Sequence, residues 1–397
     1  MQRSAIFLKK GKEEPIKRFH LWVFSGAIAR IDGQPKEGEV VDVYSFDKKW
    51  LACGHYHDNS IAVRILSFEP VSIDKTFWAG RLLSAFQLRE RLELTHNPKT
   101  NCYRLVNGEG DGFSGLIIDV YGDTAVLQAH SIGMHLHKEE LCAALLELPN
   151  LNLKFVYDKS KNTLPEKYAQ GVTESFLSPN TPEKTALTVQ ENGVNFCVDY
   201  VLGQKTGFFL DQRTNRELLG TYSKDKTVLN TFCYSGGFSL YALLNGAKRV
   251  ISVDASQKAT DLVGKNILAN PVDASRHETH TADVLKFLQA SSETYDVIVL
   301  DPPAYAKSIN KRHQAVQGYK RLNIAGLEKL NKGGILFTFS CSQVVDKQLF
   351  YDTIAAAAIE TGKKVRVLHH LSQPADHPIS MYHQEGSYLK GLVLYVE

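Results

Sequence analysis

The sequence predicts an α/β protein with a doubly wound C-terminal domain, preceded by a small β-rich domain and a central α+β domain. From residue 227 onward, apolar strand-like runs alternate with segments of helical spacing, as in a parallel sheet with helices on both faces. Residues 1–72 instead contain short strand-like runs separated by turn residues. The expected domains are therefore residues 1–72, 73–185 and 186–397, and a β-hairpin opens the last one.

The first two domains are predicted from hydrophobic spacing and from turn residues. A glycine-rich turn within 103–119 joins two strand-like runs, and we interpret its glycines as serving the reversal of the chain rather than a ligand. The expected elements are strands at 38–44, 50–56 and 61–68, a helix at 77–94, a strand at 120–129, a helix at 137–148, a connector at 162–185 and a hairpin at 186–201.

The C-terminal domain is predicted from an alternation of strands and helices. Its first helix stops at Gly246, because glycine adopts the left-handed conformation that commonly ends a helix. Its strands are expected at 228–229, 249–253, 297–300, 335–339, 365–368 and 392–396, with a short strand that ends at 280–283, and the strand at 392–396 is expected to close the sheet. Its helices are expected at 238–245, after Asp254 to about 269, and at 351–360.

The stretch 227–256 predicts a cofactor site. A loop with Gly236 and Gly237 follows the first strand, and Asp254 ends the second strand, 18 residues after Gly236. A Rossmann-like domain places such an acid, roughly 20 residues after the glycines, on ribose hydroxyls. The loop lacks the G-x-G-x-x-G pattern of NAD enzymes, which favours a nucleoside without pyrophosphate, namely S-adenosylmethionine. The alternative is an ordinary doubly wound sheet whose glycines serve packing.

Three further strand ends supply candidate chemistry, because ligands of such folds bind at the carboxyl ends of the strands. Asp283 is suited to accept a hydrogen bond from an adenine amino group. Asp301 begins the sequence Asp-Pro-Pro-Ala-Tyr and lies where methyl donor and target would meet. Tyr305 is a candidate for stacking on a target base, or else a loop aromatic packed on its own helix.

Cys341 follows the fifth strand and is the candidate nucleophile. The other cysteines, at positions 53, 102, 142, 197 and 233, are best explained as small structural residues or, for Cys233, as lining of the cofactor loop. Carbon 5 of cytosine is a poor nucleophile until a thiolate adds to C6, so methylation at C5 requires such a residue. Asp301 would then hold the cytosine edge and help to protonate N3.

Charge and composition favour a phosphate-bearing partner without requiring one. The net charge is only +3, but residues 1–30 hold seven Lys or Arg and two acids, and residues 302–327 hold five Lys or Arg and no acid. No apolar run is long enough to span a bilayer, and no Cys-x-x-Cys pair occurs. His55 and His57 lack a third ligand nearby in the sequence. We therefore expect a cytoplasmic enzyme without a metal.

An ordered set of motifs spans nearly the whole chain. It consists of WVFSG at 22–26, RLVNGEGDGFSGLIID at 104–119, GQKTGFFLDQRTNR at 203–216, NTFCYSGGFS at 230–239, DPPAYAKS at 301–308 and FSCS at 339–342. The set resembles the bacterial large-subunit (23S) rRNA cytosine-C5 methyltransferases with an N-terminal PUA domain. That resemblance implies an RNA-binding PUA domain, a class I methyltransferase domain, ribosomal RNA as substrate, often a homodimer, and a nucleophile that matches Cys341.

The complete set of expected site residues combines the strand ends, the aromatic–polar segment 203–216 and the basic stretches. Catalysis is assigned to Cys341 and Asp301, and RNA binding to Arg18, His20, Tyr305, Lys307 and Arg312. The expected cofactor contacts are Phe209, Asp211, Arg213, Asn230, Phe232, Cys233, Ser235, Gly236, Gly237, Phe238, Asp254, Ala255, Ser256, Asp283, Val284, Asp301 and Pro302.

Two departures from the family pattern leave other functions open. Ala304 stands where many related cytosine methyltransferases have a second cysteine, and Ala304-Tyr305 replaces the usual Lys-Phe. Asp-Pro-Pro-x-aromatic also resembles the loops of amino-methylating enzymes, so methylation of an RNA nitrogen is one alternative; it needs no cysteine. A second alternative is an RNA-binding protein that keeps the fold without turnover.

Overall fold

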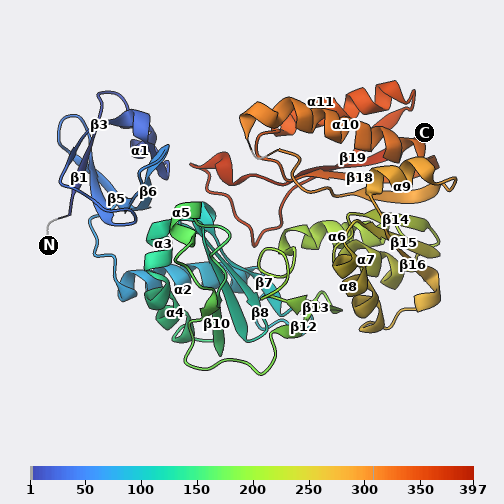
Figure 1. The fold of residues 1–397 in the computed structure, drawn as a ribbon, viewed down its shortest axis with the longest axis horizontal. Helices are drawn as coiled ribbons and strands as arrows, with labels where there is room; N and C mark the ends of the chain where they lie inside the picture. Colours follow the sequence, from blue (N-terminus) through green and yellow to red (C-terminus); the bar gives the residue numbers. More distant parts are fainter. Residues whose placement is uncertain (1–2, 307) are drawn as a thin grey trace. The chain divides into compact units, whose positions relative to one another are not determined.

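Two units make up the structure, a computed structural model that describes residues 3–306 and 308–397 (Figure 1). The first unit comprises Met1–Val189, Asp199–Phe208 and Ala375–Gly386. The second comprises Gln190–Val198, Phe209–Pro374 and Ser387–Glu397. Among the described residues, no helix combines the length and apolarity that crossing a bilayer requires.

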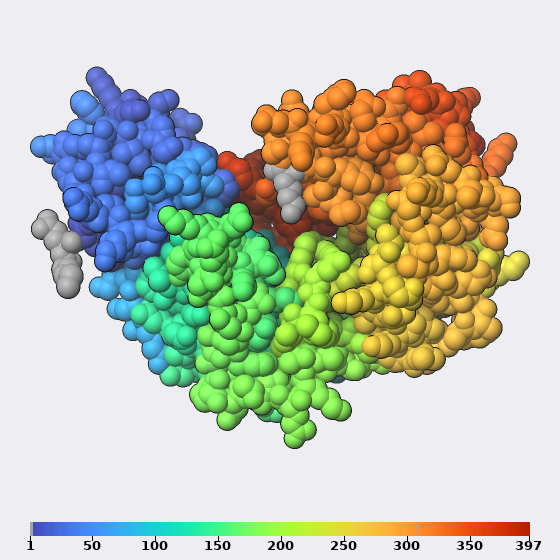
Figure 2. All heavy atoms as spheres, in the orientation of Figure 1, coloured from blue at the N-terminus to red at the C-terminus, as the bar shows by residue number. Residues whose placement is uncertain are grey.

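The first unit begins with a six-stranded sheet, in the order β2-β6-β5-β4-β1-β3. Its strands are β1 (Ala5–Leu8), β2 (Trp22–Phe24), β3 (Ile28–Asp32), β4 (Val40–Tyr44), β5 (Trp50–Tyr56) and β6 (Ile61–Ser67). β1 pairs parallel with β4 and the other pairs are antiparallel. The three strands expected from the sequence are confirmed as β4, β5 and β6. An apolar core that includes Ile6, Val41 and Val63 lies within this region, whose outer atoms are the blue spheres of Figure 2.

A five-stranded sheet, in the order β11-β10-β9-β8-β7, forms the rest of the first unit. Its strands are β7 (Cys102–Asn107), β8 (Leu116–Tyr121), β9 (Thr124–Ala129), β10 (Phe155–Asp158) and β11 (Ser175–Phe176), and the helices α2 (Lys75–Arg91) and α4 (Lys138–Leu146) pack together. Both helices and the β7–β8 hairpin were expected. The strand expected from residue 120 begins only at Thr124, because Gly122 turns the chain with a φ of 61°. The expected connector at 162–185 contains α5 (Glu166–Ala169) and β11.

The segment Ala375–Gly386 docks on the β7–β8 hairpin although it comes from the far end of the chain. Asp376 accepts a hydrogen bond from the Arg104 backbone N–H at 3.1 Å, and the Asn107 side chain donates to the Pro378 carbonyl at 2.9 Å. A Cβ atom at Gly110 would overlap that same carbonyl oxygen. The glycine-rich turn is therefore needed for chain packing here, in agreement with the structural interpretation of its glycines.

The second unit contains a seven-stranded sheet in the order β16-β15-β14-β17-β18-β20-β19. Its strands are β14 (Thr227–Thr231), β15 (Arg249–Asp254), β16 (His277–Thr281), β17 (Tyr295–Leu300), β18 (Leu330–Ser340), β19 (Val365–Leu371) and β20 (Lys390–Val396). The first five run parallel. The prediction that 392–396 closes the sheet was wrong: β20 inserts antiparallel between β18 and β19, so β19 forms the edge.

Helices cover both faces of this sheet, which confirms the doubly wound arrangement (Figure 1). One face carries α6 (Arg213–Thr221), α7 (Gly237–Leu244) and α8 (Gln257–Leu268), and the other carries α9 (Val284–Ala290), α10 (Arg312–Glu328) and α11 (Lys347–Glu360). The hairpin of β12 (Ala186–Glu191) and β13 (Val194–Asp199) precedes them, as expected. α9 and α10 were not predicted from the sequence.

A buried ion pair generates a prediction for the first unit. Arg89 is fully buried and its guanidinium donates to both oxygens of Asp111, at 2.5 and 2.8 Å. We expect Asp111→Ala to lower the free energy of unfolding by about 3–5 kcal/mol, because it leaves a buried charge without its counterion. Urea unfolding followed by tryptophan fluorescence measures this unit selectively, since Trp22, Trp50 and Trp78 all belong to it.

The control is an exposed ion pair of the same unit, Lys75–Glu147 at 2.6 Å. Glu147→Ala should change the free energy of unfolding by less than about 1 kcal/mol, because water screens both charges. Equal losses in the two variants would contradict the distinction between the pairs.

Candidate active site

The carboxyl ends of five parallel strands meet along one edge of the second unit's sheet. Thr231 at the end of β14 pairs with Val253 of β15 and with Leu300 of β17, and Leu300 pairs with Thr338 of β18. The residues that follow these positions therefore emerge side by side. They are the loop from Phe232, then Asp254, Asp283, Asp301 and Cys341, as the sequence predicted.

The loop after β14 has an unusual backbone. Phe232 and Tyr234 adopt positive φ angles of 52° and 44°, and Gly236 follows at 75°. Non-glycine residues in this region cost about 1–3 kcal/mol each and persist where surrounding contacts hold them. Those contacts include a hydrogen bond from the Tyr234 N–H to the Asp254 carboxylate at 3.0 Å. The loop is thus tied to the tip of the neighbouring strand.

The two glycines of this loop allow close packing within the protein. A Cβ atom at Gly236 would lie 2.9 Å from a methyl group of Val263, and one at Gly237 would lie 2.7 Å from the Arg216 side chain. The packing interpretation therefore explains both positions. It is compatible with a ligand on the other side of the loop.

Asp254 and Asp283, the predicted acceptors for ribose and adenine, can each accept further hydrogen bonds at their carboxylate oxygens. Asp254 is half-buried and accepts from the N–H groups of Tyr234 and Ser256, at 3.0 and 2.9 Å. Asp283 is exposed and caps α9 through one oxygen, which accepts from the Lys286 N–H at 2.9 Å. A pocket of about 370 Å³ lies next to it, and its lining includes Asp283, Phe232 and Tyr305.

Asp301 is oriented by a chain of two buried amides. Gln212 donates from Nε2 to Asp301 Oδ2 at 2.9 Å, and Asn215 donates to Gln212 Oε1 at 2.6 Å. The carboxylate is only partly buried. These amides fix one oxygen of the carboxylate in place, which is what a group that must meet a substrate edge in one orientation requires.

Residues 209–216 contact the loops at the strand edge through an aromatic contact and a hydrogen bond, and they also form ion pairs with Glu191. Phe209 places its ring 5.1 Å from that of Tyr234 in the first loop, and Asp211 accepts a hydrogen bond from the Tyr388 hydroxyl at 2.7 Å. Arg213 instead lies 3.5 Å from Glu191, a fully buried carboxylate that also forms a two-pronged pair with Arg216 at 2.8 and 2.6 Å. Arg213 thus contributes to a structural ion cluster.

Cys341 is half-buried directly after β18, and a buried lysine lies close to it. Lys390 donates from Nζ to the carbonyls of Ser342 and Val345, each at 2.7 Å, so it holds the loop that carries Cys341. Burial lowers the pKa of Lys390 to about 8, while the negative charges of Cys341 and Asp346 act in the opposite direction. Ser342 also donates to the Ala306 carbonyl at 2.6 Å, which links this loop to the one that begins at Asp301.

Two tyrosines occupy the space behind these loops. Burial raises the pKa of Tyr319 to about 12, and the charges of Cys341 and Asp301 both add to this rise, so the two groups lie within electrostatic range of one hydroxyl. Tyr305 packs 4.7 Å from the Tyr319 ring, with Gly318 of α10 beneath it. Packing on its own helix therefore explains one side of Tyr305, while its edge lines the pocket beside Asp283.

The remaining predicted site residues fall into three groups. Arg312 is exposed at the start of α10 in the second unit, and Lys307 lies outside the described residues. Arg18 is exposed in the first unit. In the same unit, His20 Nε2 lies 3.2 Å from Glu385 Oε1. The others lie along the same strand edge: Asn230, Cys233, Ser235 and Phe238 around the first loop, Ala255 and Ser256 after β15, Val284 after Asp283, and Pro302 after Asp301.

Sequence reasoning missed the residues that support the candidate groups. Gln212, Asn215, Tyr319 and Lys390 hold or surround Asp301 and Cys341, and they come from three separate segments. Two signals were present in the sequence. Gln212 and Asn215 lie in the aromatic–polar segment 203–216, and Lys390 begins the apolar run 390–396, where a charge in a buried strand needs partners.

Comparisons with known proteins agree with this geometry. Residues 6–68 match the model of a PUA-like domain, and residues 152–383 match that of an S-adenosylmethionine-dependent methyltransferase. Ribosomal RNA large subunit methyltransferase I from Vibrio campbellii is 41% identical over 98% of both chains, and that from Escherichia coli O139:H28 is 39% identical over 97% of this chain and 98% of that protein.

Solved structures give the same result for the fold. A methyltransferase from Streptococcus mutans superposes with a TM-score of 0.84 and 25% identity over the whole of both chains. A second structure with the same TM-score, identity and coverage is of a methyltransferase in complex with S-adenosylhomocysteine. The strand-edge geometry, the two matched models and the full-length relatives together show that this chain belongs to the family of S-adenosylmethionine-dependent methyltransferases with an N-terminal PUA-like domain.

Proposed function

We propose that this enzyme forms 5-methylcytosine in large-subunit ribosomal RNA through a covalent adduct between Cys341 and C6 of the base. The observation that carries the proposal is the arrangement around Cys341. This half-buried cysteine shares one sheet edge with Asp301, and the Ser342–Ala306 hydrogen bond joins the two loops. The full-length relatives named as ribosomal RNA large subunit methyltransferase I support the choice of substrate.

The strand edge fits S-adenosylmethionine by its donor and acceptor chemistry. Asp254 and Asp283 present carboxylate oxygens suited to ribose hydroxyls and an adenine amine, and Asn230 is buried with an Oδ1 that has no partner among the described residues. Phe209, Phe232 and the first loop would surround the nucleoside. When bound, the cofactor supplies an electrophilic methyl group.

The proposed reaction balances bonds and protons at the base. The Cys341 thiolate adds to C6, and the ring electron pair moves to C5, while Asp301 holds the N3–N4 edge and helps to protonate N3. C5 would take the methyl group as the carbon–sulfur bond of the donor breaks and a neutral thioether leaves. A base then removes the C5 proton, N3 gives up its added proton, and the electron pair returns to expel the thiolate. The amides of Gln212 and Asn215 keep Asp301 in the orientation that this contact needs.

Lys390 acts as a positioning residue in this scheme. Its ammonium group fixes the carbonyls of Ser342 and Val345 and supplies a positive charge beside Cys341. A cation next to a cysteine favours the thiolate, which is the reactive form. The charge is present at neutral pH, since the pKa of Lys390 is about 8.

RNA contact is proposed for the exposed basic residues Arg18 and Arg312, because guanidinium groups bind phosphates in two-pronged fashion. A homodimer and a cytoplasmic location stay predictions. Methylation of an RNA nitrogen is the second candidate, favoured by the Asp-Pro-Pro-Ala-Tyr loop at 301–305. That reaction uses no cysteine, so the variants below separate the two functions.

Covalent trapping tests the proposed nucleophile. With S-adenosylmethionine and large-subunit rRNA that contains 5-fluorocytidine, the wild type should form a stable protein–RNA adduct, because fluorine at C5 prevents removal by a base. Cys341→Ala should form none. Cys197→Ala, which changes the other half-buried cysteine, is the matched control and should trap normally. Denaturing gel electrophoresis shows the adduct as a band of reduced mobility.

Methyl transfer to ordinary rRNA at wild-type rate by Cys341→Ala, without any adduct in the wild type, would sink the cysteine mechanism. Radiolabelled methyl recovered on a ring or exocyclic nitrogen would then establish the second candidate.

The pH dependence of Cys341 alkylation tests Lys390. Lys390→Met should slow iodoacetamide labelling of Cys341 by about tenfold at pH 7, the effect of about 1.4 kcal/mol of lost thiolate stabilisation. The ratio between wild type and variant should shrink as pH rises through about 8, where Lys390 itself loses its charge. Peptide mass spectrometry measures the labelling, with Cys197 as internal reference.

Two variants distinguish charge from packing in this experiment. Lys390→Arg keeps the charge and should retain most of the reactivity of Cys341 at pH 7. Lys363→Met removes another lysine that donates to a buried carbonyl, Leu330 at 3.1 Å, and should leave Cys341 unaffected. A pH-independent loss in Lys390→Met would assign Lys390 a purely structural role.

A further inference from the structure

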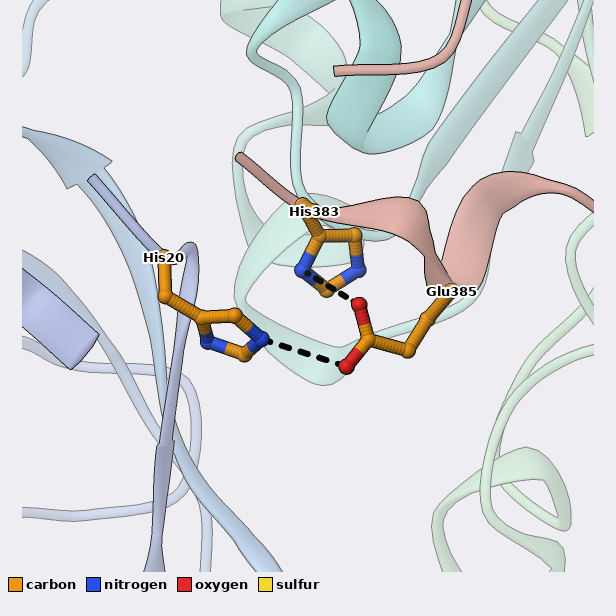
Figure 3. Close-up of side chains that lie close together, drawn as sticks. All are labelled: His20, His383 and Glu385. Carbon is orange, nitrogen blue, oxygen red and sulfur yellow. Dashed lines mark hydrogen bonds and ion pairs between the residues drawn. The ribbon is translucent and has the colours of Figure 1, made fainter. Parts of the chain in front are cut away.

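Three side chains of types that ligate metals converge in the first unit, and none of them belongs to the proposed methyl-transfer site. His20 lies just before β2, and His383 and Glu385 belong to the segment Ala375–Gly386 (Figure 3). Their ligand atoms all lie within 4.8 Å of one another. Across residues 3–306 and 308–397, no other group of three or more His, Cys, Asp or Glu gathers in this way.

Both imidazole rings face the same carboxylate. His20 Nε2 lies 3.2 Å from one oxygen of Glu385, and His383 Nδ1 lies 3.5 Å from the other (Figure 3). Ligands bound at 2.0–2.2 Å around a tetrahedral Zn²⁺ are separated by roughly 3.3 Å. The two measured separations are near this value but involve different oxygens of Glu385, so the carboxylate would bind through both oxygens or rotate, which its exposed side chain permits.

The backbone of Trp22 prepares His20 for this role. His20 Nδ1 lies 3.1 Å from the Trp22 carbonyl oxygen and 3.2 Å from the Trp22 N–H, so the backbone accepts either tautomer. With the proton on Nδ1 and donated to the carbonyl, Nε2 presents a lone pair to the Glu385 carboxylate. In this tautomer the two electron-rich atoms at 3.2 Å share a proton or a metal ion, whereas in the other tautomer Nε2 donates directly to Glu385. Donation of the second nitrogen to a carbonyl is also the usual support of a metal-ligating histidine.

His383 supplies a second, independent observation. Its side chain is 1% exposed and packs 4.3 Å from the Trp22 ring, yet Nδ1 makes no hydrogen bond within the described part of the chain. An unpaired buried ring nitrogen costs free energy unless something binds it.

The charges around the cluster permit a cation. Arg64 lies over the Trp22 ring and acts electrostatically on His383, and its guanidinium pairs with Glu109 at 3.1 Å. Glu109 also lowers the cost of a positive charge at His383, as its effect on the pKa of this ring indicates. The Glu385 side chain is half-exposed, so a metal ion can reach the site from solvent. A water molecule could then occupy the fourth coordination position of the ion.

We propose that His20, His383 and Glu385 form a divalent-metal site, with Zn²⁺ as the best-fitting ion, that fastens the segment Ala375–Gly386 to the sheet of the first unit. Two imidazoles and one carboxylate are a donor set that suits Zn²⁺. The site joins residues 365 positions apart in the sequence and is distinct from the proposed methyl-transfer chemistry. The sequence predicted no metal, because it has no Cys-x-x-Cys pair and His55 and His57 lack a third ligand nearby; His20 is far from His383 and Glu385 in the chain.

Metal binding to the isolated enzyme tests the site without RNA or S-adenosylmethionine, so the result does not depend on the proposed reaction. Enzyme stripped with a chelator should bind one Zn²⁺ in calorimetric titration and raise its melting temperature. Co²⁺ should give the visible absorption bands of a tetrahedral N/O site. Glu385→Gln, which keeps the shape of an exposed side chain, should weaken Zn²⁺ binding by more than the roughly 10–100-fold that loss of an outer partner costs.

A matched control separates this site from ordinary histidine–acid pairs. His280 lies 3.9 Å from Glu278, is exposed and has no third ligand among the described residues, so His280→Ala should bind Zn²⁺ as the wild type does. His383→Ala should lose the Co²⁺ bands, and its far-ultraviolet circular dichroism reports whether it folds. Absence of stoichiometric binding in the wild type, or equal affinities in Glu385→Gln and wild type, would overturn the proposal and leave a hydrogen-bonded cluster.

Discussion

Parallel pairing of β14, β15, β17 and β18 is the constraint on which the proposed active site depends. Parallel strands in register end at the same edge, so one geometric fact places the first loop, Asp254, Asp301 and Cys341 together. The strained backbone of the first loop follows from this, because its hydrogen bond to Asp254 exists only while β14 and β15 stay paired. The antiparallel strand β20 then adds Lys390 opposite Ser340, next to Cys341.

Polar contacts between segments that are distant in the sequence hold each unit together. Asp376 and Pro378 dock on the β7–β8 hairpin, and in the second unit Glu191 from the hairpin strand β12 pairs with Arg216 of α6. These contacts are buried, so each is costly to break singly. They hold in place the loops that carry the proposed chemistry and the cluster around Glu385.

Strands and helices with strong hydrophobic periodicity could be predicted from the sequence. A helix with weak periodicity and the position of a strand within the sheet could not. β5 agrees with its prediction at both ends, and β4 and α7 begin or end within two residues. α10 was missed because its apolar residues were not recognised as one helical stripe. β20 was placed at the wrong position because its apolar run indicates a buried strand without indicating which strands lie beside it. Pairing order is a property of the folded sheet, not of one run of residues.

The sequence by itself determined the succession of strands in the C-terminal domain, the acids and the cysteine at the strand ends, and the family to which the chain belongs. These follow from local patterns and from motifs whose spacing is written in the chain. Only the tertiary structure decided that Gln212 orients Asp301, that Lys390 stands beside Cys341, and that His20 meets His383 and Glu385. The physical reason is that such contacts depend on distances of a few ångströms between residues that lie 49 to 365 positions apart in the sequence, which no local pattern records.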